Sequence, residues 1–137
     1  MADRSLLLVD DDALLLDSLV RILRVRFLVR TATSPIRALE MLRASPREFF
    51  AIVTDVRMPE MDGPTFLERA SRIAPHARTI LMSGDLETDD LMRAVNGPGV
   101  FRALMKPLAP PRLIGALEDA WQAYLLSTSA ASGRKAV

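Results

Sequence analysis

Short apolar runs alternate along the whole chain with longer segments in which apolar residues recur every three or four positions. The short runs predict strands at residues 6–9, 27–32, 49–55, 79–82 and 100–104. The longer segments predict helices, one ending near residue 26, others starting at 34–35, 64 and 110–111, and a weaker one over 86–95. Runs without a polar side indicate strands covered on both faces. The pattern therefore predicts an α/β fold, a doubly wound five-stranded parallel sheet with helices on both faces.

The composition narrows the possible classes of protein. A chain of 137 residues that is 50% hydrophobic favours one domain with a real core. A formal net charge of +1 gives no strong overall field toward nucleic acid or membranes. The absence of cysteine excludes disulfides, thiolate metal sites and cysteine nucleophiles. No apolar run is long enough for a bilayer and the first residues do not form a signal peptide, so we expect a cytoplasmic location.

The chain divides into a domain and a short tail. The strand and helix pattern covers residues 4–126, whereas residues 127–137 are small and polar. Such a segment has too few apolar residues to pack by itself. We therefore expect residues 127–137 to be a flexible tail or the start of a linker.

Polar residues follow four of the five predicted strands. They are Asp10, Asp11 and Asp12 after the first strand, Asp55 after the third, Ser83 after the fourth and Lys106 after the fifth. Taken singly, each has an ordinary explanation as a helix cap, a turn residue or a solvated lysine. In a doubly wound sheet, however, the carboxyl ends of the strands meet at the edge where ligands bind. Carboxylates, a hydroxyl and an ammonium are therefore expected to lie together at one edge.

Charge decides what such a cluster can do. Two carboxylates about 4 Å apart repel by roughly 4 kcal/mol at an effective dielectric constant near 20, so a cation or a proton has to accompany them. Carboxylate oxygens suit Mg²⁺, which proteins hold through one or two carboxylates together with phosphate oxygens. A carboxylate is also a nucleophile toward phosphorus, and phosphoryl transfer mainly requires positioning and charge neutralisation. The cluster therefore favours formation of an aspartyl phosphate.

Four segments of the chain resemble the motifs of one family. They are Val9-Asp10-Asp11-Asp12, the run from Asp55 to Gly63, Met82-Ser83-Gly84 and Met105-Lys106-Pro107. In order and spacing they are similar to the receiver domain of bacterial two-component response regulators, the CheY-like domain, over about residues 4–126. The resemblance implies a flavodoxin-like (βα)5 fold with strand order 2-1-3-4-5.

The resemblance also implies roles for the residues of the first two motifs. Asp55 would be the phosphoacceptor. Asp10 and Asp11 would hold Mg²⁺, with Asp55 and the backbone carbonyl of Arg57 as further ligands and Mn²⁺ as a possible substitute for the metal. Asp12 is assigned to capping the first helix.

The last two motifs would supply the groups that contact the phosphoryl oxygens. Ser83 would hydrogen-bond a phosphoryl oxygen and move on activation. Lys106 would form a salt bridge to the phosphate, and the bond between Lys106 and Pro107 would be cis, a state open to bonds that precede proline.

One position departs from the family. Three residues before the lysine of the fifth strand the family usually has Tyr or Phe, and this chain has Ala103. The nearest aromatic residue, Phe101, is two residues earlier, which predicts the same face of the sheet one pleat back. The usual inward swing of an aromatic side chain cannot be carried by Ala103.

The resemblance implies a response regulator rather than an enzyme, one that promotes its own phosphorylation and dephosphorylation. The expected partners are a histidine kinase or histidine phosphotransferase as phosphodonor, and a downstream protein target or a fused effector. We expect neither direct nucleic-acid contact by this domain nor membrane contact. A dimer linked to phosphorylation and an output face made by the fourth helix, fifth strand and fifth helix are further expectations.

The sequence also bears on three other possible functions. The main alternative is an interaction module that keeps the receiver fold but does not signal through phosphate, which Ala103 favours. A phosphatase with an aspartate nucleophile would need a carboxylate where this chain has Arg57. A nucleotide enzyme would need a glycine-rich phosphate loop after the first strand, which the sequence lacks.

Overall fold

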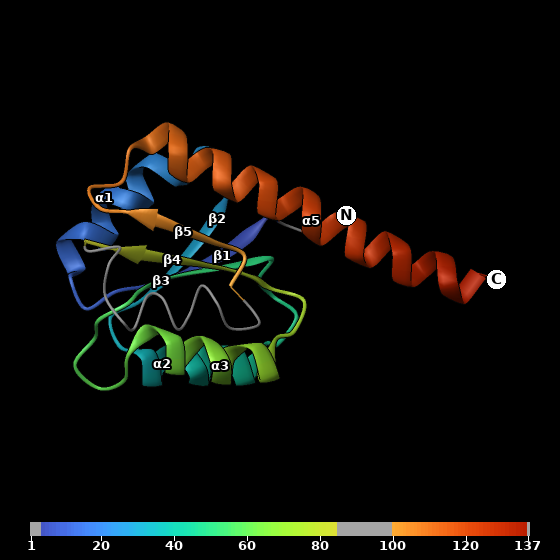
Figure 1. Cartoon of the computed structure of the whole chain (residues 1–137), viewed down its shortest axis with the longest axis horizontal. Helices are drawn as coiled ribbons and strands as arrows, with labels where there is room; N and C mark the ends of the chain where they lie inside the picture. Colours follow the sequence, from blue (N-terminus) through green and yellow to red (C-terminus); the bar gives the residue numbers. More distant parts are fainter. Residues whose placement is uncertain (1–3, 85–99, 137) are drawn as a thin grey trace.

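The computed structural model describes residues 4–84 and 100–136, and the side chains as far as residue 128. Five parallel strands form one sheet in the order β2-β1-β3-β4-β5 (Figure 1). The strands are β1 (Ser5–Val9), β2 (Leu28–Ala32), β3 (Ala51–Asp55), β4 (Arg78–Ser83) and β5 (Arg102–Met105). The expected fold class and strand order are confirmed.

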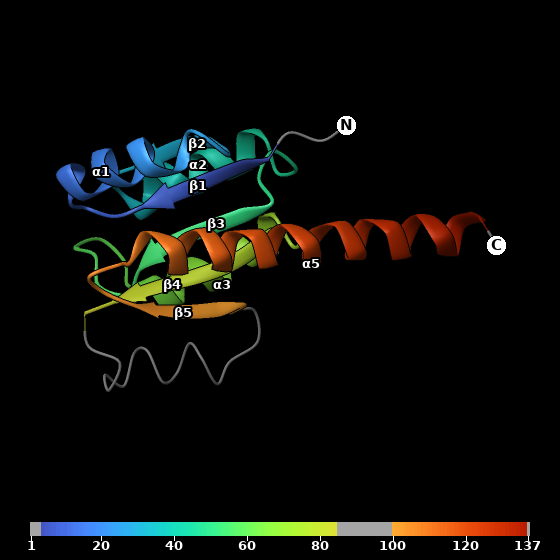
Figure 2. The ribbon, with the colours of Figure 1, turned by 90° about the horizontal axis from the view of Figure 1, so that it is seen from above.

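Helices cover both faces of this sheet. They are α1 (Ala13–Leu23), α2 (Pro35–Ala44), α3 (Gly63–Ile73) and α5 (Pro110–Ala136). Helices α1 and α5 lie on one face, and α2 and α3 lie on the other (Figures 1 and 2). The helix expected over residues 86–95 lies outside the described residues. No described helix is long and apolar enough to cross a membrane.

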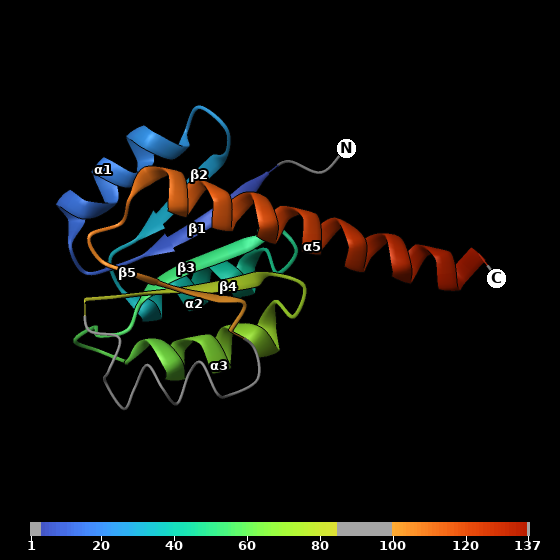
Figure 3. The ribbon, with the colours of Figure 1, turned by 45° about the horizontal axis from the view of Figure 1, so that its top comes forward.

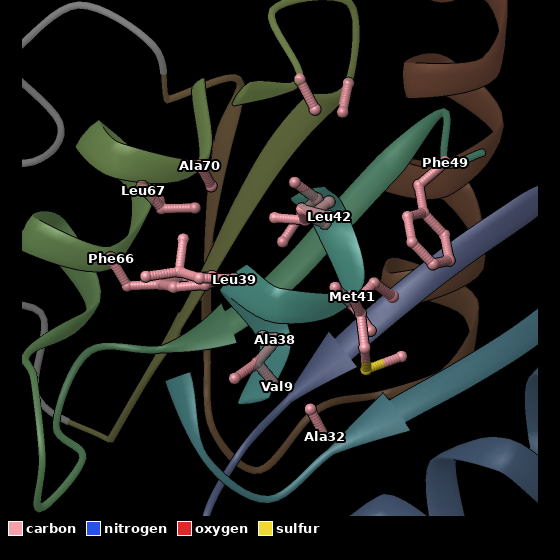
Figure 4. Packing of buried hydrophobic residues seen from close by; sticks show 14 of the residues in the cluster. Val9, Ala32, Ala38, Leu39, Met41, Leu42, Phe49, Phe66, Leu67 and Ala70 are labelled. Atoms are coloured by element: carbon pink, nitrogen blue, oxygen red, sulfur yellow. The ribbon is translucent and has the colours of Figure 1, made fainter. Parts of the chain in front are cut away.

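Two hydrophobic clusters, one on each face, explain why the strands are apolar throughout. In β1, Leu7 packs into the cluster with α2 and α3, whereas Leu6 and Leu8 pack into the cluster with α1 and α5. Figure 4 shows part of the first cluster, with Leu39 of α2 and Phe66 of α3. Fully burying one such side chain stabilises the fold by about 1.5–3 kcal/mol. The sheet is therefore held by alternate side chains that point to opposite faces.

Side chains close to the predicted boundaries cap the helices. The Ser34 hydroxyl accepts hydrogen bonds from the main-chain N–H groups at the start of α2, where Pro35 is the first helical residue. An oxygen of Asp12 accepts from the N–H of Leu15, so the predicted capping role of Asp12 is confirmed. Asp62 caps α3 in the same way. These caps satisfy N–H groups that have no partner within the helix.

Helix α5 is longer than the sequence predicts. It has 27 residues and runs to Ala136, well beyond the ends of the strands (Figures 2 and 3). The structure continues α5 over residues 127–136, for which the sequence predicts no helix, and the flexibility of this segment stays a prediction. Extending an existing helix requires no new nucleation, and this segment contains no proline to end the helix. Whether these residues also begin a linker stays a prediction.

The first half of α5 is attached to the sheet by aromatic rings. The rings of Phe50 and Trp121 meet edge to face with their centroids 5.1 Å apart, and Trp121 stacks on Tyr124 at 5.6 Å. Near the end of the attached half, the Arg78 guanidinium donates to the carbonyl of Ala123 and to the hydroxyl of Ser127. Beyond Ser127 the helix leaves the sheet.

Candidate functional site

Three carboxylates meet at the carboxyl edge of the central strands. Asp10 follows β1 and Asp55 ends β3, and these two strands are neighbours in the sheet. One oxygen atom from each of Asp10, Asp11 and Asp55 lies within 4.8 Å of the others. Asp10 is buried, Asp55 is partly buried and Asp11 is exposed. The three could hold a metal ion, and a set made only of oxygen ligands fits a hard divalent cation.

The ammonium of Lys106 lies between two of these carboxylates. Its Nζ donates to Oδ2 of Asp10 and to Oδ2 of Asp55, both at 3.1 Å. At that distance and an effective dielectric constant near 20, each attraction is roughly 5 kcal/mol before the cost of desolvation. Lys106 therefore supplies the positive charge that neighbouring carboxylates need.

The same contacts shift the ionisation of the lysine. Burial lowers the pKa of Lys106, but the hydrogen bonds from its ammonium to Asp10 and Asp55 and the charges of both carboxylates raise it by more. The net result is a pKa above the ordinary lysine value. Lys106 is therefore a fixed cation at neutral pH.

Main-chain N–H groups orient the other oxygens of the two carboxylates. Oδ1 of Asp10 accepts from the N–H of Asp12 at 2.9 Å, and Oδ1 of Asp55 accepts from the N–H of Val56 at 2.8 Å. Each carboxylate thus has one oxygen bound to the backbone and one bound to the ammonium. The arrangement is preorganised, because neither carboxylate has to rotate to present its Oδ2 atom.

Ser83 ends β4 on the same edge. It is buried, and its carbonyl accepts from the main-chain N–H of Lys106 at 2.7 Å. In the register of the sheet, Met82 of β4 lies opposite Asp55, so Ser83 is one residue beyond the level of that carboxylate. Arg57 is exposed in the loop after β3. The roles of the Ser83 hydroxyl and the Arg57 carbonyl stay predictions.

Gly63 and Thr54 also support the site, although no role was predicted for either residue. The N–H of Gly63 donates to the carbonyl of Val56 at 2.7 Å, and a Cβ at this position would overlap the carbonyl oxygen of Asp55. The buried Thr54 hydroxyl donates to the same Asp55 carbonyl at 3.1 Å. Gly63 stood in a recognised motif, but only the fold reveals how closely its backbone approaches β3.

Comparison with known proteins identifies the family. The model of the response regulator receiver domain matches residues 6–118. The chain belongs to this family. The receiver is 37% identical to the two-component response regulator ORR21 of Oryza sativa subsp. indica, over 85% of this chain and 16% of that protein. It is 30% identical to the hydrogenase transcriptional regulatory protein HoxA of Bradyrhizobium diazoefficiens, over 89% of this chain and 25% of that protein.

A solved structure agrees over nearly the whole receiver. It is the crystal structure described as the adenylate cyclase from Rhodopirellula baltica, with a TM-score of 0.92 and 34% identity. The match covers 98% of this chain and 99% of that chain. The receiver thus spans a quarter or less of the curated relatives ORR21 and HoxA, but almost all of this solved chain.

The fifth strand of the receiver differs from the expectation at one point. Ala103 packs against the cluster of α2 and α3, whereas Phe101 packs against the cluster of α1 and α5. The prediction that both lie on one face was wrong, because Phe101 precedes Arg102, the first residue of β5, and strict alternation applies only within a strand. The Arg102 guanidinium lies 5.1 Å from the centre of the Phe101 ring.

The cis bond between Lys106 and Pro107 is confirmed.

Proposed function

We propose that this receiver is the phosphoacceptor of a two-component phosphorelay, and that Asp55 accepts a phosphoryl group from a phosphohistidine in an Mg²⁺-dependent reaction. The observation that carries the proposal is the shared ammonium, because Lys106 lies 3.1 Å from both Asp55 and Asp10. A nucleophile, acidic metal ligands and a fixed cation then surround one point at the sheet edge. Phosphoryl transfer needs little more from a protein than this.

The reaction would proceed by displacement at phosphorus. An oxygen of Asp55 forms the new O–P bond, the P–N bond to the donor histidine breaks, and its electron pair leaves with the imidazole. Lys106 neutralises charge on the phosphoryl oxygens, and the Ser83 hydroxyl donates to one of them. A bound Mg²⁺, or Mn²⁺ in its place, would neutralise the remaining charge, held by Asp10, Asp11, Asp55 and the carbonyl of Arg57.

The consequence of phosphorylation would be a changed protein-binding face. The chain would promote its own phosphorylation and dephosphorylation without turning over a separate substrate. Its partners would be a histidine kinase or phosphotransferase and a cytoplasmic protein target or fused effector. The greater length of the regulatory relatives favours a fused effector, as do their names, which are those of transcriptional and two-component regulators.

Intact-mass analysis after incubation with a small-molecule phosphodonor tests the proposal. We expect one added phosphoryl group that requires Mg²⁺ and is absent in Asp55→Asn. The matched control is Asp12→Asn, which keeps a capping side chain next to the cluster and should be labelled like the unaltered chain. Labelling of Asp55→Asn at the unaltered rate would show that another residue is the acceptor.

A second candidate is an interaction module that works without phosphate. Ala103 favours it, because this small side chain cannot perform the aromatic swing that usually accompanies activation. If no adduct forms under conditions that label another receiver, and a captured partner binds Asp55→Asn as tightly as the unaltered chain, this second function holds and the first fails.

A further inference from the structure

The outer edge of β2 has main-chain groups that bond to no other strand. β2 lies at the edge of the sheet opposite β5, so among the described residues it pairs with β1 alone (Figure 2). The N–H of Leu28 donates to the carbonyl of Arg4, next to β1. Main-chain groups alternate in direction along a strand, so those of Val29 and Thr31 point away from β1. Another extended chain could bond to these groups.

β2 lacks the usual protection of an edge strand. Natural edge strands carry lysine or proline, contain a bulge, or are covered by another element. β2 pairs without a bulge over its five residues, and its one charged residue is Arg30. The guanidinium of Arg30 is turned to the loop before β3, where it donates to Glu48 at 2.8 Å and lies 5.9 Å from the centre of the Phe49 ring. Its charge is therefore directed away from the open edge.

Two large apolar side chains are exposed where β2 begins. Val25, in the turn after α1, is 83% exposed, and Leu28, the first residue of β2, is 56% exposed. Single exposed apolar residues are common on proteins, but these two adjoin unpaired strand groups. An extended peptide that joins a sheet edge uses both features, main-chain bonds for affinity and side-chain contacts for specificity.

Arginines surround the same end of β2. Arg21 and Arg24 at the end of α1 are exposed, as is Arg26 in the turn. Arg21 and Arg24 form no ion pair within the described part of the chain. Arg26 approaches Glu118 only at 3.9 Å, and that carboxylate also binds Arg4. Cations at the end of a helix stabilise it, but this role does not account for the exposed apolar residues beside them. The charge here favours an acidic partner.

We propose that the outer edge of β2 binds an extended acidic segment of another protein, which joins the sheet as an additional strand. The main chain of the segment bonds to Val29 and Thr31. Its acidic side chains lie beside Arg24 and Arg26, and an apolar side chain of the segment covers Leu28.

Two other occupants fit less well. A second copy of this chain, paired antiparallel about the middle of β2, would place Arg30 opposite Arg30, and like charges in directly opposite positions destabilise a sheet. An anionic lipid surface would attract the arginines, but it has no main-chain groups to bond to Val29 and Thr31. The acidic strand uses the charges, the apolar residues and the open main-chain groups together.

Peptide binding, measured by fluorescence anisotropy, tests the proposal. The probe is a labelled synthetic peptide with valine and threonine in its middle and glutamates at both ends, titrated with the unaltered chain up to millimolar concentration. We expect this peptide to bind, and the same peptide with lysines in place of glutamates not to bind. No binding of the acidic peptide, or equal binding of the two, would overturn the proposal.

N-methylation of the peptide tests the main-chain bonds without altering the protein. Only every second N–H of an added strand faces β2. Of two acidic peptides methylated at alternate sets of residues, we therefore expect one to bind and the other not to bind. Equal binding of both would show that the peptide does not join the sheet.

Thr31→Pro tests the same bonds from the side of the protein. It removes an N–H that points away from β1 and leaves the bonds to β1 in place. Thr31→Ala keeps this N–H and is the matched control. We expect the dissociation constant of the acidic peptide to rise about tenfold in Thr31→Pro and to stay unchanged in Thr31→Ala. Equal rises in both variants, or in neither, would refute a role for the strand edge.

A charge reversal tests the choice of an acidic partner. Arg24→Glu should raise the dissociation constant of the acidic peptide about fivefold at low salt and less at high salt. The control is Arg69→Glu, an exposed position on α3, which should bind like the unaltered chain. Equal effects of the two changes would show that only the net charge matters and would refute the assigned surface.

Two further measurements test the other occupants. Binding of the unaltered chain to phosphatidylserine vesicles that Arg24→Glu abolishes, without binding of the acidic peptide, would assign the surface to lipid. A dimer in sedimentation equilibrium that Thr31→Pro abolishes would assign the edge to a second copy. Either result would overturn the proposal. Asp55→Asn should bind the peptide like the unaltered chain, so this test is independent of the proposed phosphorylation.

Discussion

Replacing Lys106 with methionine isolates the effect of its charge. The change keeps a long side chain but leaves Asp10, which is 1% exposed, without the ammonium that lies 3.1 Å away. Breaking a buried ion pair by removing one partner typically costs about 3–5 kcal/mol. We expect the metal-free Lys106→Met chain to lose stability by this order, because the remaining carboxylates repel one another.

The same change should strengthen metal binding. The ammonium lies 3.1 Å from a carboxylate oxygen, and a ligand oxygen lies about 2.1 Å from Mg²⁺, so an ion held by the same oxygen would be no more than about 5 Å from the ammonium. A unit charge and a divalent ion at that distance repel by roughly 1.7 kcal/mol even at the dielectric constant of water. Removing the ammonium should therefore lower the Mg²⁺ dissociation constant tenfold or more.

Thermal unfolding at increasing Mg²⁺ concentrations measures both effects. The stability of Lys106→Met should start lower than that of the unaltered chain and rise more steeply with metal, since a ligand at a hundred times its dissociation constant adds about 2.7 kcal/mol. Lys106→Arg, which keeps the charge, is the control and should respond like the unaltered chain. Metal affinity that is equal or weaker in Lys106→Met would refute the reasoning that the lysine and the metal compete for these carboxylates.

Three further predictions follow from the site. Gly63→Ala should destabilise the chain by about 1–3 kcal/mol in denaturant unfolding and slow labelling, because its Cβ would overlap the Asp55 carbonyl; equal stability would contradict this. Asp12→Ala should cost about 1 kcal/mol through the lost cap and leave labelling intact, whereas lost labelling would assign Asp12 to the chemistry. The raised pKa of Lys106 means that its stabilisation is complete below about pH 10.4 and is lost as the pH rises through the folded-state value, which unfolding at pH 9 and above would test.

The sequence was enough to predict the sheet and the edge of the site. Strands that are apolar on both faces and helices with regular spacing do not depend on distant contacts, so predicted and observed boundaries differ by only a few residues. The sequence also predicted that Asp10, Asp55 and Lys106 lie close together, because the carboxyl ends of parallel strands meet at one edge of the sheet. The fourth predicted helix lies outside the described residues and is untested.

The features that the sequence did not predict depend on contacts with other parts of the chain. Residues 127–136 have no regular spacing of apolar residues that would predict a helix. They are helical in the structure because they extend the helix that precedes them. The side on which Phe101 packs depends on where β5 begins, and a single residue reverses it. The sharing of one ammonium by Asp10 and Asp55 depends on side-chain conformations that spacing does not specify.

The aromatic contacts of α5 provide a natural optical probe. Trp121 is the only tryptophan in the chain, and its ring contacts the rings of Phe50 and of Tyr124, the only tyrosine. Its emission should therefore report whether α5 is attached to the sheet, and energy transfer from Tyr124 should report whether the stacked pair is intact. Asp55 and Lys106 lie at the other end of the strands. A change in the Trp121 emission or in the energy transfer on phosphorylation would therefore show that a structural change at Asp55 reaches the opposite end of the domain.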